Sequence, residues 1–341
     1  MDPPIFEFNR FKNNNLIRLN ILLQDCPQYL INIKNKKIAL CILKYESRNI
    51  LTENIKNIII TSSNSTNSID FILKLSNTQI ITVTKNGILK IWDLTVGFSI
   101  KTILGPKYLM CIEKININKI ATGDFMDGSI KIWDCNTGKY IMKIIAHPTT
   151  GACCCIVKLN ENQLASGGND WIIKIWDLTN GTCLKTLKGH KSSINILVKQ
   201  NENQFISGGN DGLIKIWNNA NGYLVKTLSE HNDSVNHIIK IRKSIIVSGT
   251  KYTSIKIWDI TTFTCLKSIE DDFDLISLVN LSGNKFISGG INIKYIKVWD
   301  IIKNSYEVIE VGKEFNVIVK LNNFQIVIAY EKGGIEVKNI I

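Results

Sequence analysis

Six of the seven tryptophans recur at a nearly constant interval, and this periodicity constrains the fold of the 341-residue chain more than any other feature. Successive members lie 41, 43, 41, 41 and 41 residues apart, and four of the six end the sequence Ile-Lys-Ile-Trp. They are Trp92, Trp133, Trp176, Trp217, Trp258 and Trp299. A unit of about 40 residues is too small to bury a core of its own, so the spacing predicts a repeated unit that packs against its neighbours.

Around each tryptophan the sequence has the pattern of short β-strands. Residues 194–198 and 213–217 are rich in β-branched side chains and are bounded by Gly, Asn and Asp, which is typical of strands joined by tight turns. The Asn-Gly pairs at 180–181 and 221–222 can adopt the positive φ angles that a hairpin turn requires. Each unit therefore predicts one four-stranded antiparallel sheet. A ring of such sheets would bury both faces of every sheet.

The order of these motifs resembles that of the WD-repeat β-propeller family. At residues 207–218 the chain reads Ser-Gly-Gly, Asn-Asp-Gly, Leu, Ile-Lys-Ile-Trp and Asn, and an Asp follows the tryptophan in the five other units. The resemblance covers residues 16–341, with strong motifs in the six tryptophan units and weak ones at both ends. It implies an all-β fold, a β-propeller built from four-stranded antiparallel blades.

The spacing at the two ends predicts how many blades there are. Thr52 lies 40 residues before Trp92 and Lys338 lies 39 residues after Trp299, and each ends a degenerate copy of the tryptophan strand. We therefore predict eight blades, with seven as the alternative. The last unit has only three strands, so residues 16–23 (Leu16 to Leu23) are predicted to supply the fourth and close the ring. Residues 1–15 would form a short N-terminal arm and residues 16–341 the propeller.

The resemblance also implies a buried hydrogen-bond chain of His, Ser, Asp and Trp within a blade. Two complete sets are present: His147, Ser166, Asp170 and Trp176, and His190, Ser207, Asp211 and Trp217. An imidazole can bridge the carboxylate and the hydroxyl, and the hydroxyl can accept the indole N–H. Ser, His and Asp also form hydrolase triads, but a buried, repeated set offers no cleft and no oxyanion donors. We therefore interpret both sets as structural and predict no catalytic residue.

Other units depart from this pattern. Pro106 stands at the His position of the Trp133 unit, Tyr252 at the Asp position of the Trp258 unit, and Ile293 at the Asp position of the Trp299 unit. We expect those blades to be less rigid.

One rim of a propeller is often the binding rim in this family, and here it is irregular in two neighbouring units. The turn at residues 122–127 is one residue longer than its counterpart at 207–211, and Trp171 takes the place of Gly212. Exposed aromatic clusters are candidate interface anchors. The predicted partner-binding residues are Phe125, Met126 and Trp171, with Lys251 and Tyr252 as secondary candidates. The opposite rim has nearly identical turns at 160–163 and 201–204, which argues against individual recognition there.

Charge and cysteines add weaker signals. The net charge is +12, but only four of the 41 basic residues are arginines, so a nucleic-acid track is the less favoured interpretation. Its candidates are the lysines two residues before each tryptophan, with stems that can pack while the ammonium groups reach water: Lys90, Lys131, Lys174, Lys215, Lys256 and Lys297. Cys153, Cys154 and Cys155 alternate between strand faces and cannot converge on one ion, so we expect core packing and no metal site.

These observations favour a non-catalytic scaffold that binds protein or peptide partners. A substrate-recognition subunit of a ubiquitin ligase is a narrower alternative, a nucleic-acid-associated protein is an alternative of another class, and an enzyme is the least favoured. We expect no cofactor, no small-molecule substrate and no membrane association. No apolar run approaches the roughly 18 residues of a membrane span, and the first residues lack the pattern of a secretory signal. A cytoplasmic or nuclear location is therefore expected.

Overall fold

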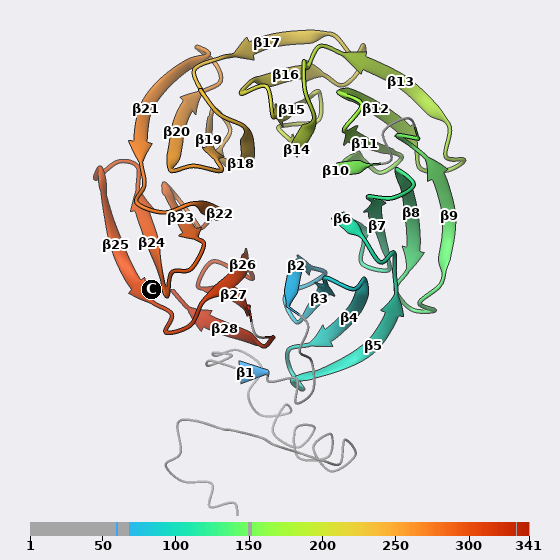
Figure 1. Cartoon of the computed structure of the whole chain (residues 1–341), viewed down its shortest axis with the longest axis horizontal. Helices are drawn as coiled ribbons and strands as arrows, with labels where there is room; N and C mark the ends of the chain where they lie inside the picture. Colours follow the sequence, from blue (N-terminus) through green and yellow to red (C-terminus); the bar gives the residue numbers. More distant parts are fainter. Residues whose placement is uncertain (1–58, 61–67, 149–151, 332, 341) are drawn as a thin grey trace, which may run out of the picture.

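The computed structural model describes residues 59–60, 68–148, 152–331 and 333–340, and these form seven four-stranded sheets arranged in a ring (Figure 1). All pairings within the sheets are antiparallel. The predicted all-β propeller is confirmed. The favoured count of eight blades is wrong, because the structure has seven. We number the blades 1 to 7 along the chain.

The first four blades follow one another without interruption of the strand order. Blade 1 contains β2 (Ile69–Lys74), β3 (Gln79–Thr84), β4 (Ile88–Asp93) and β5 (Phe98–Leu104). Blade 2 contains β6 (Leu109–Asn116), β7 (Lys119–Asp124), β8 (Ser129–Asp134) and β9 (Tyr140–Ile145). Blade 3 contains β10 (Cys153–Asn160), β11 (Gln163–Gly168), β12 (Ile172–Asp177) and β13 (Cys183–Lys188). Blade 4 contains β14 (Ile194–Lys199), β15 (Gln204–Gly209), β16 (Ile214–Asn218) and β17 (Leu224–Leu228).

The last three blades include the one that joins the two ends of the chain. Blade 5 contains β18 (Val235–Arg242), β19 (Ile245–Thr250), β20 (Ser254–Asp259) and β21 (Thr264–Glu270). Blade 6 contains β22 (Leu275–Asn280), β23 (Lys285–Gly290), β24 (Tyr295–Asp300) and β25 (Ser305–Glu310). Blade 7 contains β26 (Phe315–Lys320), β27 (Gln325–Tyr330), β28 (Ile335–Asn339) and β1 (Ile59–Ile60).

The fourth strand of blade 7 comes from the N-terminal side of the chain. Ile59 pairs with Glu336 and Ile60 with Ile335, so β1 lies beside β28 (Figure 1). The sequence assigned this place to residues 16–23, which lie outside the described residues, as do Thr52 and the predicted arm at 1–15. The count of eight treated the segment before β2 as a whole unit, whereas its described part contributes only the outer strand of blade 7.

Seven apolar clusters fill the seven interfaces between neighbouring blades. In six of them the tryptophan of one blade packs among residues of the preceding blade; Trp217, for example, lies with Val157 and Ile173 of blade 3. The cluster between blades 7 and 1 joins Val327 and Ala329 to Ile72 and Trp92. The core is therefore continuous around the ring.

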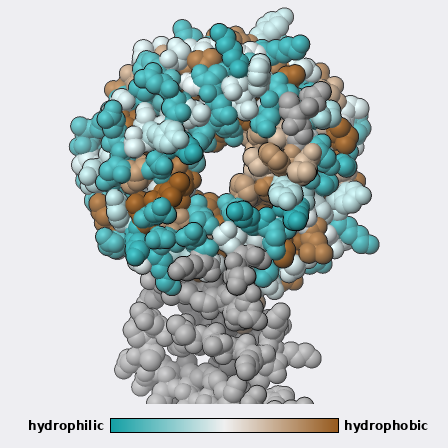
Figure 2. All heavy atoms as spheres, in the orientation of Figure 1, coloured by the Kyte–Doolittle hydropathy of each residue, from teal (hydrophilic) through white to brown (hydrophobic). Residues whose placement is uncertain are grey.

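The connections between strands lie on two rims. We call the upper rim the one formed by the turns between second and third strands and by the connections from one blade to the next. The lower rim carries the turns between first and second strands and between third and fourth strands. The first strands, β2, β6, β10, β14, β18, β22 and β26, are innermost (Figure 1), and the channel that they surround is open in the space-filling view (Figure 2).

The closure predicts a difference between two proline substitutions in the full chain. Ile60→Pro removes a backbone donor from the strand that pairs with β28, so we expect the unfolding free energy to fall by about 1 to 2 kcal/mol and the melting temperature to drop by a few degrees. Ile17→Pro, in the segment that the sequence favoured, is the comparison and should lower the melting temperature less. A larger drop for Ile17→Pro than for Ile60→Pro would contradict this closure.

Candidate functional site

Trp171 occupies a turn position that requires a left-handed backbone. In blades 1 to 5, the residue five positions before the repeated tryptophan has a positive φ angle. These residues are Gly87 (79°), Gly128 (60°), Trp171 (66°), Gly212 (72°) and Thr253 (49°). A side chain in this region costs roughly 1 to 2 kcal/mol. The Trp171 indole does not recover that cost by burial, since the residue is 52% exposed. Strain of this kind often marks a functional position.

Phe125 and Met126 lie in the corresponding turn of blade 2, between β7 and β8. The Phe125 N–H donates to the Tyr108 carbonyl at 2.9 Å, and the residues that make the matching bond in blades 3 and 4 are Asn169 and Asn210. Phe125 is 44% exposed and Met126 65% exposed. An apolar pair therefore replaces a polar turn residue at the surface.

Two further exposed residues lie beside this turn, and the sequence analysis missed both. Tyr108 and Met110, at the start of β6, are 50% and 38% exposed. The signal available in the sequence was the Tyr-Leu-Met run two residues after Pro106. We call Tyr108, Met110, Phe125, Met126 and Trp171 the aromatic rim patch. Its members lie on the upper rim of adjacent blades, although no ring contact joins Trp171 to Phe125 among the described residues.

Lys251 and Tyr252 lie two blades away from Trp171, in the turn between β19 and β20. The Lys251 Nζ atom is 5.3 Å from the centre of the Tyr252 ring, and Tyr252 is 55% exposed. This pair is a separate feature of the upper rim and is not part of the aromatic rim patch.

The two complete polar sets each form a connected chain of hydrogen bonds. In blade 3 the His147 Nδ1 atom lies 2.9 Å from Asp170, and His147 Nε2 lies 2.8 Å from the Ser166 hydroxyl. The Trp176 indole N–H donates to the same hydroxyl at 2.8 Å. Because a carboxylate only accepts, His147 Nδ1 donates to Asp170, and Nε2 accepts the Ser166 proton. The arrangement leaves no free nucleophile.

Blade 4 repeats this geometry. His190 Nδ1 lies 2.9 Å from Asp211, His190 Nε2 lies 2.7 Å from the Ser207 hydroxyl, and the Trp217 indole donates to that hydroxyl at 2.8 Å. Burial lowers the pKa of His190 although Asp211 opposes the shift. The imidazole is thus neutral at pH 7, as the hydrogen-bond assignment requires.

Blade 5 has an incomplete chain. His231 Nε2 lies 2.6 Å from the Ser248 hydroxyl, which accepts the Trp258 indole N–H at 2.7 Å. The buried Nδ1 atom of His231 has no hydrogen-bond partner among the described residues, because Tyr252 stands where blades 3 and 4 have Asp. Burial lowers the pKa of His231 to about 4.

Blade 6 uses an ion pair that the sequence analysis missed. Asp271 lies 17 residues before Ser288, the same interval as His231 to Ser248, and accepts the Ser288 hydroxyl proton at 2.9 Å. The Lys297 ammonium lies 2.6 Å from Asp271 and 2.6 Å from Asp272, and the Trp299 indole donates to Ser288 at 2.8 Å. Aligning the units on their serines would have revealed Asp271 in the histidine position.

The lysines two residues before each tryptophan do not form an exposed track. Lys297 and Lys215 are buried, Lys215 donates to Thr227 at 2.9 Å, and Lys174 donates to the Ala146 carbonyl at 2.6 Å. The expectation that these ammonium groups reach water therefore fails for Lys297 and Lys215. Both are held by polar partners within their own blades.

The consecutive cysteines pack as strand residues. Cys153 and Cys155 are buried, and Cys154 is partly exposed. Burial raises the pKa of Cys154 to about 12 and raises that of Cys155 as well, so both stay protonated at neutral pH. Over the described ranges no group of three or more His, Cys, Asp or Glu side chains is placed to hold a metal ion. Nor does this part of the chain contain a helix long and apolar enough to cross a membrane.

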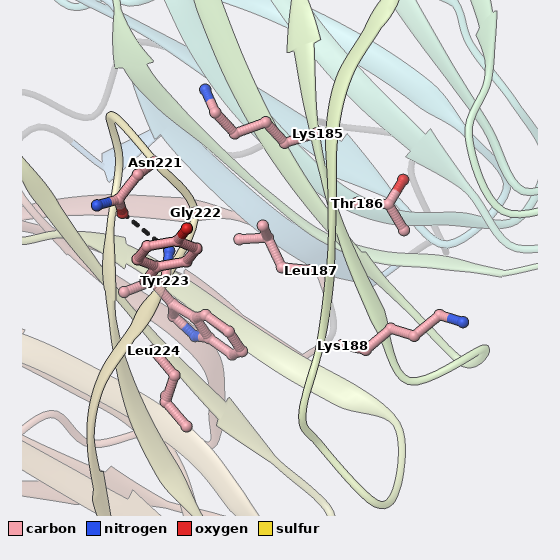
Figure 3. Close-up of a pocket in the computed structure, with 9 residues that line it drawn as sticks. Lys185, Thr186, Leu187, Lys188, Asn221, Gly222, Tyr223 and Leu224 are labelled. Atoms are coloured by element: carbon pink, nitrogen blue, oxygen red, sulfur yellow. Dashed lines mark hydrogen bonds between the residues drawn. The ribbon is translucent and has the colours of Figure 1, made fainter.

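The outer surface carries a shallow groove of about 480 Å³ between blades 3 and 4 (Figure 3). Leu187 of β13 packs against Gly222, and Tyr223, beside it, is 72% exposed. The remaining lining residues are Lys185, Thr186, Lys188, Trp217, Asn221 and Leu224. No cluster of titratable groups converges there among the described side chains, so the groove adds no chemistry to the site.

The incomplete chain of blade 5 predicts that Tyr252→Asp stabilises the protein. The new carboxylate would accept from His231 Nδ1 as Asp211 does from His190, so we expect about 1 kcal/mol of additional stability at pH 7. Without this carboxylate, the pKa of His231 in the folded protein is about 4, below the value of roughly 6.5 in the unfolded chain. The unfolding free energy therefore falls as the pH drops from 6.5 towards 4. The variant should reduce this loss in urea unfolding at several pH values. Tyr252→Ala removes the ring without adding an acceptor, and an equal gain from it would refute the explanation.

Comparison with known proteins relates three of these blades' repeats to a known family model. The model of the WD domain, G-beta repeat, matches residues 138–177, 181–218 and 222–259. The chain is similar to the nuclear distribution protein PAC1 of Arthroderma otae, with 25% identity over 149 residues, 36% of this chain and 31% of that protein. It is also similar to autophagy-related protein 16 of Arabidopsis thaliana, with 24% identity over 131 residues, 38% of this chain and 25% of that protein.

A third relative is the ribosome biogenesis protein WDR12 homolog of Trichoplax adhaerens, with 31% identity over 141 residues, 40% of this chain and 33% of that protein. The chain thus spans about a third or less of the length of these curated relatives. Three consecutive repeats of the chain match the WD domain, G-beta repeat, and they lie in a closed ring of four-stranded blades, so the structure is a β-propeller that carries WD repeats.

Proposed function

We propose that this propeller is a non-catalytic scaffold that binds a protein or peptide partner through the aromatic rim patch of blades 2 and 3. Its WD-repeat relatives suggest a protein-interaction role, and their names refer to nuclear distribution, autophagy and ribosome biogenesis. These processes differ, so the relatives support the class of function and leave the partner open. The Ser-His-Asp sets support the non-catalytic part, because each polar atom in them is engaged within its blade.

The observation that carries the proposal is the strained and exposed Trp171. A glycine would satisfy the left-handed backbone at no cost, as it does in blades 1, 2 and 4. Trp171 instead holds a large aromatic surface in water at 52% exposure. Exposed aromatic side chains on a rigid turn are favoured as anchors because little side-chain entropy is lost when they become buried. Phe125 and Met126, exposed in the corresponding turn of the adjacent blade 2, would add to the apolar surface that a partner covers.

The proposal predicts that stability and partner binding change in opposite directions in Trp171→Gly. Removing the strain should keep or raise the unfolding free energy, by up to about 1 kcal/mol. Combined with Phe125→Asn, which restores the polar turn residue of blades 3 and 4, the variant should lose its partners in quantitative pull-downs from native extract.

A matched control is Phe324→Asn, an exposed aromatic on the lower rim in the turn between β26 and β27 (73% exposed). It should retain the same partners as the unmodified protein. Partners that persist in Trp171→Gly with Phe125→Asn, in a protein that melts normally, would remove blades 2 and 3 as the binding site.

A further inference from the structure

The seven innermost strands present a repeated basic position close to the lower rim. In each blade this residue pairs with the residue six further along, as Lys74 does with Ile80 and Lys240 with Ile246. Blade 6 has Asn280 there, paired with Phe286. All other blades have lysine, and we call these six residues the lysine belt: Lys74, Lys114, Lys158, Lys199, Lys240 and Lys320.

Members of the lysine belt reach from one blade to the preceding one. Lys114 donates to the Leu75 carbonyl, and that carbonyl immediately follows the belt position of blade 1. The same bond joins Lys240 to Gln200, Lys320 to Leu281, and Lys74 to Leu321. The amide of Asn280 also donates backwards, to the Lys240 carbonyl at 2.7 Å. The ammonium groups are therefore held in fixed places around the lower mouth of the channel.

Carboxylates neutralise only part of this charge. Lys158 pairs with Glu161 at 2.7 Å and Lys199 with Glu202 at 2.6 Å. Glu113, next to Lys114, accepts from the Lys158 backbone N–H, and burial raises its pKa to about 7, so its negative charge is partial at neutral pH.

The remaining four belt lysines have no carboxylate partner among the salt bridges of the described residues. Lys74, Lys114, Lys240 and Lys320 donate to neutral carbonyls, and each ammonium retains further N–H donors. The pKa of Lys320 is lowered by burial and by the charge of Lys74, which reflects the repulsion across blades 7 and 1. Half-buried cations of one sign thus lie around one opening of the channel.

From this arrangement we propose that the lysine belt binds a compact polyphosphate at the lower mouth of the channel. Charges of one sign placed around an axis add their potentials on that axis, so the complementary ligand carries several negative charges there. Each phosphate contributes about −1.5 to −2 charges, whereas an extended acidic peptide offers one carboxylate per roughly 3.3 to 3.6 Å of chain. Lysine binds phosphate as a point charge, so a belt of lysines suits a ligand whose negative charge is concentrated in one place.

The site differs from the aromatic rim patch in rim, charge and ligand. Its chemistry fits a free inositol polyphosphate and equally a phosphoinositide headgroup. Binding to either would relieve the repulsion between the belt lysines, so the ligand stabilises the fold by mass action. The proposal therefore stands or falls independently of the proposed scaffold function.

The test is isothermal titration of the full chain with inositol hexakisphosphate at about 0.15 M salt, where long-range attraction to the net charge is screened. We expect saturable binding and a raised melting temperature. Lys240→Gln with Lys320→Gln should weaken binding at least about tenfold, whereas Lys240→Arg with Lys320→Arg should retain it. Lys139→Gln with Lys303→Gln removes the same charge from exposed lower-rim turns and should alter affinity less than about twofold.

Several outcomes would overturn the proposal. The first is that the protein binds neither inositol hexakisphosphate nor phosphatidylcholine vesicles carrying phosphatidylinositol bisphosphate. The second is that the Lys139 and Lys303 control weakens binding as much as the belt variant does. The third is that a polyglutamate peptide binds as tightly as inositol hexakisphosphate and depends on the same belt lysines. Binding to the soluble ligand alone supports the free polyphosphate, and binding to the vesicles supports the headgroup. If the double Gln variant unfolds, Lys240→Gln and Lys320→Gln singly provide the comparison, each with an expected loss of about threefold or more.

Discussion

The hydrogen bond from each tryptophan indole to a hydroxyl on the second strand is the interaction on which the ring depends. Six blades have it, at 2.7 to 2.8 Å, with a serine acceptor in four blades and a threonine in two. The indole packs on the preceding blade while its N–H stays satisfied inside its own blade, as a buried indole requires. The same side chain therefore fixes the sheet internally and joins it to its neighbour. Blade 7, which has Lys338 in the corresponding register, is completed instead by β1 from the other end of the chain.

The hydroxyl that accepts the indole N–H also determines which kind of side chain can lie beside that hydroxyl. Blades 3 and 4 use a hydrogen-bonded His-Asp pair, blade 5 a histidine alone, and blade 6 the Asp271-Lys297 ion pair. Ser166 donates to His147 in blade 3, and Ser288 donates to Asp271 in blade 6. Both acceptors lie at a similar distance from the hydroxyl, 2.8 and 2.9 Å. A buried carboxylate then requires a cation, and Lys297 supplies it. The ring tolerates different chemistry in this position, and blade 5 even leaves the buried His231 Nδ1 atom without a hydrogen-bond partner among the described residues.

The sequence predicted the repeated features of the fold, and its predictions were wrong or incomplete at positions that depart from the repeat. The period of about 41 residues predicted the blade and its four strands, and the resemblance to the WD-repeat family predicted the placement of His147 with Ser166 and Trp176. The blade count was wrong because the segment before β2 was interpreted as a whole unit, whereas its described part contributes only the strand Ile59–Ile60 to blade 7. Asp271 escaped notice since a carboxylate in place of an imidazole breaks the motif while preserving the bond. The left-handed backbone of Trp171 was suggested by its alignment with Gly212, but its exposure required the structure.

The two rims illustrate two ways in which a repeat protein can acquire a binding surface. On the upper rim, recognition is attributed to departures from the repeat, such as Trp171 in a glycine position. The lower rim was judged uninformative because its turns are nearly identical, which does argue against recognition by any single loop. Yet repeated units around an axis bring the same side chain to the same radius, so one lysine in each of six blades forms the lysine belt. Regularity therefore excludes a ligand that reads one loop and favours a ligand that is itself compact and uniformly charged.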